Sequence, residues 1–232
     1  MIGVLGGMGP LATADFFSKV LAATPAGGDA EHVPMLILSD PRIPPRPPAI
    51  LGDGESPLPA LRVARDRLLG AGATALAMPC NTAHFWYAEL AAECPVPFLS
   101  IIDASCGEVE SLVARGDAVG IIGTWATLAA KLFDARLVAL GYVPIVPDDE
   151  TISGIVSPAI EQVKQGHAAD GGRLLAPVVE QLLAGGAKAV ILACTKVPLA
   201  LDAIDSPLRV RCVDSTAALA RACVNYWREA RE

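Results

Sequence analysis

Two cysteines, Cys80 and Cys194, each stand directly after an apolar segment and directly before short polar residues. If each apolar segment is a strand of a parallel sheet, its carboxyl end faces the ligand side, so both thiols are expected at functional edges. A thiol has a reference pKa of about 8.5, which suits it to give or to take a proton. Inversion of a carbon stereocentre needs one such group on each face of the carbon. If the two thiols face one carbon from opposite sides, the pair would suit racemisation.

The segments that carry these cysteines belong to a weak internal repeat. Three pairs of segments align in the same order along the chain: 2–13 with 119–130, 68–81 with 182–195, and 100–105 with 211–216. The second pair aligns Cys80 with Cys194, and the third aligns Asp103 with Asp214. The offsets are 117, 114 and 111 residues. Two related halves would present the two thiols to one ligand from opposite sides.

Apolar segments alternate with helical patterns along the whole chain, which predicts βαβ units and parallel pairing. Strands are expected at 2–6, 33–39, 73–79, 97–102, 118–123, 142–146, 187–193 and 209–213, with a last helix at about 215–229. The expected fold is an α/β protein of two pseudo-symmetric lobes, each a parallel sheet flanked by helices, with the active site between them. Residues 1–100 with 210–232 would form the first lobe, and 101–209 the second.

The charge and composition narrow the functional classes. The net charge of -7, from 18 basic and 25 acidic residues, argues against nucleic acid as a partner. Apolar runs are too short for a membrane span, and no targeting signal is evident, so a cytoplasmic location is expected. The three histidines, at 32, 84 and 167, are scattered, and no C-x-x-C occurs. No metal site is expected.

A glycine-rich turn follows the first predicted strand. Gly7, Gly9 and Ala12 fit a dinucleotide fingerprint, which would make the chain a nucleotide-binding module. Pro10 within the turn argues against that interpretation, and so does the absence of a predicted strand that ends in an acidic residue about 20 positions later, since Asp40 comes too late. A tight strand-to-helix turn beside the active site is the better prediction.

Several motifs together resemble one family. MPCNTAH (78–84), LACTKVPL (192–199) and IGVLGGMGP (2–10) resemble the aspartate/glutamate racemase superfamily, and its aspartate racemases most closely. Supporting matches are SDPRIPPR (39–46), GTWAT (123–127) and EQVKQG (161–166). The resemblance implies two α/β lobes, a homodimer, no pyridoxal phosphate or other cofactor, and a small acidic amino acid as substrate. Racemisation of aspartate is expected first, and of glutamate second.

The resemblance also implies roles for particular residues. Besides the catalytic Cys80 and Cys194, it implies six substrate-binding residues: Arg46, Asn81, Thr82, Thr124, Lys164 and Thr195. Arg46 and Lys164 would hold the side-chain carboxylate. Prolines at 41, 44, 45, 47 and 48 independently favour a stiff loop around Arg46. For Lys164, a solvated helix face shared with Glu161 is an equal alternative from the pattern alone.

Other interpretations remain open at this stage. The same cysteines would serve a hydantoin racemase or a maleate isomerase-like enzyme, and a non-catalytic small-ligand-binding protein is a further alternative. Lys196 stands where the second motif usually has Glu, which bears on the substrate and on the acidity of Cys194. His84 is expected in a first helical turn rather than as a base, and Arg42 on the surface or in a salt bridge. The remaining thiols are expected to serve packing: Cys94, Cys106, Cys212 and Cys223.

Overall fold

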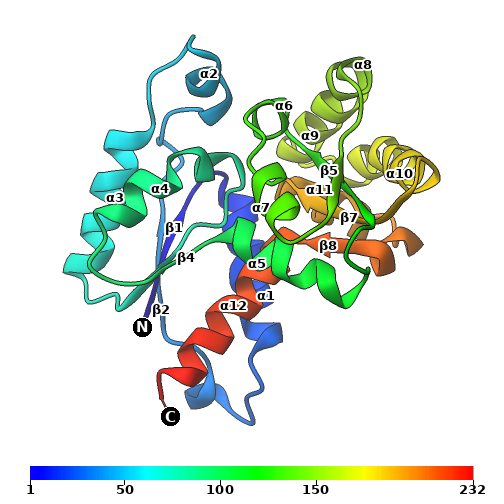
Figure 1. Cartoon of the computed structure of the whole chain (residues 1–232). Helices are drawn as coiled ribbons and strands as arrows, with labels where there is room; N and C mark the ends of the chain where they lie inside the picture. The colour runs from blue at the N-terminus through cyan, green and yellow to red at the C-terminus, as the bar shows by residue number, and fades with distance from the viewer. Residues whose placement is uncertain (232) are drawn as a thin grey trace. The chain divides into compact units, whose positions relative to one another are not determined.

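A computed structural model describes residues 1–231, which form two compact units (Figure 1). The first unit comprises Met1–Ala104 and the C-terminal segment from Thr216, and the second comprises Ser105–Ser215. Each contains a four-stranded parallel sheet flanked by helices, in the order β2-β1-β3-β4 in the first and β6-β5-β7-β8 in the second. The predicted α/β class with two parallel sheets is confirmed.

The first unit is built on a sheet whose central strand is buried along its whole length. The strands are β1 (Ile2–Gly6), β2 (Met35–Ser39), β3 (Ala75–Ala77) and β4 (Phe98–Leu99). The main helices are α1 (Pro10–Ala23), α2 (Arg46–Leu51), α3 (Leu58–Gly70), α4 (Tyr87–Ala92), the first half of α5 (Ile101–Glu108) and α12 (Ser215–Glu229) after its first residue. All residues of β1 and β3 are buried. This is the pattern of a parallel sheet covered by helices on both faces.

The second unit repeats this plan. Its strands are β5 (Ala118–Gly123), β6 (Val143–Ile145), β7 (Ala187–Ala193) and β8 (Cys212–Asp214). Its α-helices are α6 (Trp125–Ala129), α7 (Asp134–Ala139), α8 (Asp149–Thr151), α9 (Ser157–Lys164), α10 (Ala168–Ala184) and α11 (Lys196–Asp202). The core of the unit forms where α9, α10 and α11 pack on β7.

The repeat is visible in the packing as well as in the sequence. Gly3 of β1 pairs with Leu76, and Gly120 of β5 pairs with Val190. A Cβ atom on Gly3 would lie 2.8 Å from the Leu76 side chain, and one on Gly120 would lie 3.0 Å from the Val190 side chain. The next neighbours also correspond, because these Cβ atoms would lie 3.2 Å from Leu68 and 3.3 Å from Leu182. Both sheets therefore need a glycine at the same place.

One alignment within the predicted repeat is wrong. Leu99 pairs with Ala77 in the first sheet, and Val213 pairs with Ile191 in the second. Ala77 corresponds to Ile191, 114 residues later in the chain, so their partners Leu99 and Val213 also correspond. The next residue is Ser100 in the first half and Asp214 in the second. The third pair thus has the same offset as the second, and Asp103 does not correspond to Asp214.

The units also divide differently from the sequence-based boundaries. β8 (Cys212–Asp214) pairs with β7, so it belongs to the second unit, whereas the sequence assigned residues from 210 onward to the first lobe. Residues 101–104 lie in the first unit, because α5 begins directly after β4. No helix within residues 1–231 is both long and apolar enough to span a bilayer.

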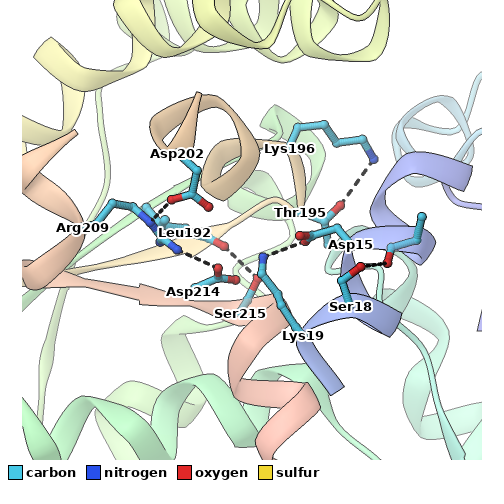
Figure 2. A network of polar contacts seen from close by, with 11 residues as sticks. Asp15, Ser18, Lys19, Leu192, Thr195, Lys196, Asp202, Arg209, Asp214 and Ser215 are labelled. Atoms are coloured by element: carbon cyan, nitrogen blue, oxygen red, sulfur yellow. Dashed lines mark hydrogen bonds and ion pairs between the residues drawn. The ribbon is translucent and has the colours of Figure 1, made fainter. Parts of the chain in front are cut away.

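A partly buried ion pair lies at the end of β8 in the second unit. Arg209 donates from Nε to Asp202 Oδ1 (2.6 Å) and from Nη2 to Asp214 Oδ2 (2.9 Å), as Figure 2 shows. The Asp214 side chain is only 6% exposed. Removal of one member of a charge pair at a buried carboxylate is costly in free energy.

We therefore expect Arg209→Ala to lower the free energy of unfolding by about 3 kcal/mol. Urea denaturation followed by circular dichroism measures this change. Arg173→Ala is the matched control, because Arg173 pairs with Asp170 on the surface, where both side chains are more than 60% exposed. That substitution should cost less than about 1 kcal/mol. Similar losses in both variants would contradict the structural role of Arg209.

Candidate functional site

Cys80 lies just beyond the carboxyl end of β3 in the first unit. Its N–H donates to the Met78 carbonyl (2.8 Å), which folds the chain tightly around Pro79. The residue is 6% exposed and packs in a core cluster with Met8 and Ile43. Asn81 and Thr82, which follow it, are also buried. The thiol is thus held at the edge of the sheet among apolar side chains.

The His84 imidazole is buried and bonded at both nitrogens. Nδ1 lies 2.8 Å from the Cys80 carbonyl oxygen, and Nε2 lies 3.0 Å from the backbone nitrogen of Ile101. Since the Ile101 N–H only donates, Nε2 is the acceptor and Nδ1 carries the proton. Burial lowers the pKa of His84 to about 4, against the opposing effects of the Cys80 carbonyl and of the Asp103 carboxylate. The ring is therefore neutral near pH 7.

This buried neutral ring makes stability depend on pH. An unfolded histidine titrates near pH 6.5, so between pH 6.5 and about 4 the unfolded chain binds a proton that the folded chain does not. Stability is complete above that window and falls as the pH decreases through it. We expect His84→Gln to remove roughly 2–3 kcal/mol of the loss between pH 7 and 4. Urea titrations of both proteins at each pH measure the difference, and parallel pH profiles would contradict it.

Arg46, the first residue of α2, lies at the turn that follows β1. Its Nη1 donates to the carbonyls of Ile43 (3.2 Å) and Pro44 (3.0 Å), and its Nη2 donates to that of Met8 (3.4 Å). The guanidinium has five N–H donors, so two remain beyond these three bonds. The proline-rich loop thus fixes a cation beside the glycine turn.

The glycine turn itself is shaped by close packing. Gly7 has φ of +88°, and a Cβ atom there would lie 2.4 Å from the Asp40 backbone. Its N–H donates to Thr13 Oγ1 (2.8 Å), which ties the turn to α1. These contacts support the interpretation as a tight strand-to-helix turn. Arg42 is exposed and pairs with Asp40, as expected for a surface residue.

Cys194 lies just beyond β7 in the second unit and is also 6% exposed. Gly123, the last residue of β5, pairs with Ala193, so Thr124 and Cys194 follow neighbouring strand ends. A Cβ atom on Gly123 would lie 2.8 Å from the Ala193 carbonyl oxygen, so glycine permits this close approach. The structure thereby brings Thr124, Cys194 and the buried Thr195 to one edge of the second sheet.

One hydroxyl and one ammonium group near Cys194 in the chain make local contacts. Thr124 Oγ1 caps α6 by accepting from the Thr127 N–H (3.2 Å). Lys196 begins α11, and its Nζ lies 3.4 Å from Thr195 Oγ1, as Figure 2 shows. An ammonium thus stands two residues after Cys194 in the chain.

Lys164 has different surroundings from the other predicted site residues. It lies in the last turn of α9, and its Nζ donates to Glu161 Oε2 at 2.9 Å. Both side chains are about half exposed. These contacts are those of a solvated helix face, the alternative that the pattern left open. A substrate-binding role for Lys164 rests on the resemblance alone.

Two of the remaining cysteines have raised pKa values. Burial raises the pKa of Cys212 to about 11 and that of Cys223 to about 12, so neither thiol ionises readily near neutrality. Cys106 is buried, and Cys94 is partly buried. No group of three or more His, Cys, Asp or Glu side chains within residues 1–231 is arranged to hold a metal ion.

Comparison with known proteins agrees with this arrangement over almost the whole chain. Residues 5–223 match the family described as Asp/Glu/Hydantoin racemase. The broad specificity amino-acid racemase RacX of Bacillus subtilis (strain 168) is 29% identical over 233 residues, which cover 98% of each chain. Among solved structures, Picrophilus torridus aspartate racemase is 29% identical, with a TM-score of 0.84 over 98% of this chain and 94% of its own. An aspartate racemase homologue from Pyrococcus horikoshii OT3, 24% identical with a TM-score of 0.76 over 98% of both chains, shares the fold.

Two four-stranded parallel sheets, each with a cysteine after its third strand in chain order, give the racemase fold. The match over residues 5–223 then fixes the family. The chain belongs to the Asp/Glu/hydantoin racemase family, a family of isomerases.

Proposed function

We propose that this protein racemises a small acidic amino acid, aspartate before glutamate, with Cys80 and Cys194 as the two proton-transfer groups and without a cofactor. The observation that carries the proposal is the equivalence of the two cysteines. Each follows the third strand of its sheet in chain order, β3 or β7. The pairings Gly3–Leu76 and Gly120–Val190 give these two strands the same register, with each cysteine four residues after the paired position.

The chemistry follows from this equivalence. One cysteine, as thiolate, removes the α-proton and breaks the Cα–H bond, whose electron pair passes into the carboxylate as an enediolate. The other cysteine, as thiol, donates its proton to the opposite face of the same carbon. The product has the inverted configuration, and the thiol and thiolate have exchanged roles. The α-proton is weakly acidic, so donors around the developing charge must supply much of the catalysis.

The surrounding side chains support an amino-acid substrate. Asn81 and Thr82 beside Cys80, and Thr195 beside Cys194, supply amide and hydroxyl groups for the α-amino and α-carboxylate groups, and Thr124 supplies a further hydroxyl. Arg46 retains donors for a second carboxylate after its bonds to the loop. We assign the substrate side chain to Arg46, with Lys164 as a second cation, and we expect a homodimer.

A substrate panel tests the proposal. Each pure L-amino acid is incubated with the protein in heavy water without added cofactor, and chiral chromatography measures the D-enantiomer formed. Aspartate should racemise fastest and glutamate next. Racemisation of a hydantoin but of no amino acid would support the alternative within the same family. Binding without turnover of any compound would mean that the protein is a ligand-binding member. Light scattering of the purified protein measures the oligomeric state.

One relative favours a second candidate for the substrate range. The Bacillus subtilis protein is named a broad specificity amino-acid racemase and matches this chain over almost its full length. Comparable rates for several neutral amino acids and for aspartate would assign that broader range to this chain, and would show that Arg46 does not select the substrate.

A further inference from the structure

His84 links two separate segments of the first unit through one ring. Its Nδ1–H donates to the Cys80 carbonyl, and its Nε2 accepts from the Ile101 N–H at the start of α5. The ring stacks on Tyr87, with centroids 5.2 Å apart and planes inclined by 9°. The Tyr87 hydroxyl in turn donates to the Phe98 carbonyl (2.5 Å) at β4. The imidazole is thus fixed in its plane and at both nitrogens.

This ring completes the fixation of the Cys80 main chain. The Cys80 N–H already donates to Met78 (2.8 Å), and His84 engages its carbonyl (2.8 Å). The peptide groups on both sides of the Cys80 α-carbon are therefore hydrogen-bonded. The position of the thiol then depends only on rotation about χ1. A reacting group with so few free torsions is preorganised for proton transfer at the α-carbon.

Cys194 is held by different means in the second unit. Its carbonyl accepts from the backbone N–H of Val197 (3.0 Å), at the start of α11. The position that corresponds to His84, 114 residues later, is Pro198, which has no side-chain donor. The position that corresponds to Ile101 is Ser215, whose hydroxyl donates to the Leu192 carbonyl (2.8 Å), as Figure 2 shows. The repeat therefore provides an internal comparison, because the histidine contact of the first half has no counterpart at Pro198.

We propose that His84 is a positioning residue for Cys80 alone, acting through the Cys80 main chain and not by proton transfer with the substrate. The inference rests on the proposed function, in which Cys80 acts at the α-carbon. It adds that the main chains of Cys80 and Cys194 are held in place by different contacts. Both ring nitrogens are engaged by main-chain groups, so the imidazole has no lone pair or N–H left for the substrate.

Three variants separate the two hydrogen bonds. His84→Asn retains a donor at the place of Nδ1, His84→Gln retains an acceptor at the place of Nε2, and His84→Leu removes both. Each native protein is treated with iodoacetamide, and peptide mass spectrometry measures the alkylation rates of Cys80 and Cys194 separately. Loss of the bond to the Cys80 carbonyl frees a thiol that is otherwise held and little exposed. We expect its alkylation to rise about fivefold in the Gln and Leu variants, with Asn near wild type and Cys194 within about twofold throughout.

Kinetics give a second measurement on the same proteins. Displacement of one reacting group should lower kcat for racemisation by about tenfold or more in the Gln and Leu variants, with KM within about twofold and with rescue by Asn. Equal changes at Cys80 and Cys194, or no change at Cys80, would overturn the proposal. If the wild type racemises nothing, the proposed function fails, while the alkylation rates still test the link between His84 and Cys80.

A measurement on the wild type covers the case in which a variant does not fold. Nitrogen NMR of the histidines in the intact protein identifies the tautomer of each ring. The proposal requires His84 to be neutral with the proton on Nδ1 at pH 7. A ring protonated on Nε2, or one that exchanges between tautomers, would overturn it.

Discussion

In Cys80→Ser and in Cys194→Ser, racemisation should fall by about three orders of magnitude or more, because groups that act as a unit are not additive. A serine hydroxyl is too weak an acid and its alkoxide too rarely formed to replace a thiol near neutrality. Loss of either cysteine therefore interrupts the transfer across the α-carbon. Chiral chromatography of aspartate measures the rate, and Cys94→Ser is the control that should stay near wild type.

Each cysteine variant should also retain part of the reaction. The remaining thiolate can remove the α-proton from one enantiomer and return a solvent deuteron to the same face. NMR of L- and D-aspartate in heavy water measures this exchange, and the two variants should prefer opposite enantiomers. Preference for the same enantiomer would mean that the thiols do not act on opposite faces. Racemisation at the wild-type rate in either variant would exclude the two-thiol mechanism.

Arg46→Ala should weaken the use of aspartate by roughly 2–3 kcal/mol in kcat/KM, because the second carboxylate loses a charge-assisted pair of hydrogen bonds. A substrate without that carboxylate, such as alanine, should lose much less. Arg42→Ala is the matched control, because Arg42 lies on the same loop but is exposed and paired with Asp40. It should change kcat/KM by less than about 0.5 kcal/mol.

The comparison of substrates separates recognition from support of the loop. Arg46 also bonds three backbone carbonyls, so its removal loosens the turn at Met8. A looser turn alone would slow the racemisation of aspartate and of alanine equally. An equal loss for both substrates would therefore assign Arg46 to the loop and leave the second carboxylate to other residues.

Much of the fold could be predicted from the sequence because the central strands of both sheets are buried. β1 is apolar throughout and β7 is apolar from Ala189 to Ala193, and the predicted bounds of both strands match those observed. β4 was expected at 97–102 but is confined to Phe98–Leu99. The apolar run continues through Ile101 and Ile102, yet these residues begin α5. A short apolar run does not distinguish a strand from a buried helical turn, and the same ambiguity misaligned Asp103 with Asp214.

The candidate site was predictable where neighbouring residues define it. The positions of Cys80 and Cys194 after their strands follow from the apolar runs before them. The contact of His84 with Ile101 joins residues 17 apart and depends on where α5 begins. A histidine four residues after a cysteine was the only signal, and it does not reveal a bond to a carbonyl. The Lys164–Glu161 pair was visible as a spacing of three on a helix.

The matched glycines at 3 and 120 show that packing within each sheet constrains some residues of both halves in the same way. The halves agree at these glycines and at their leucine neighbours, 68 and 182, because both sheets need the same close packing there. Where corresponding positions differ, as at His84 and Pro198, folding of the common plan tolerates either residue. A position at which the two halves differ, such as 84, is therefore one where the shared fold does not dictate the side chain.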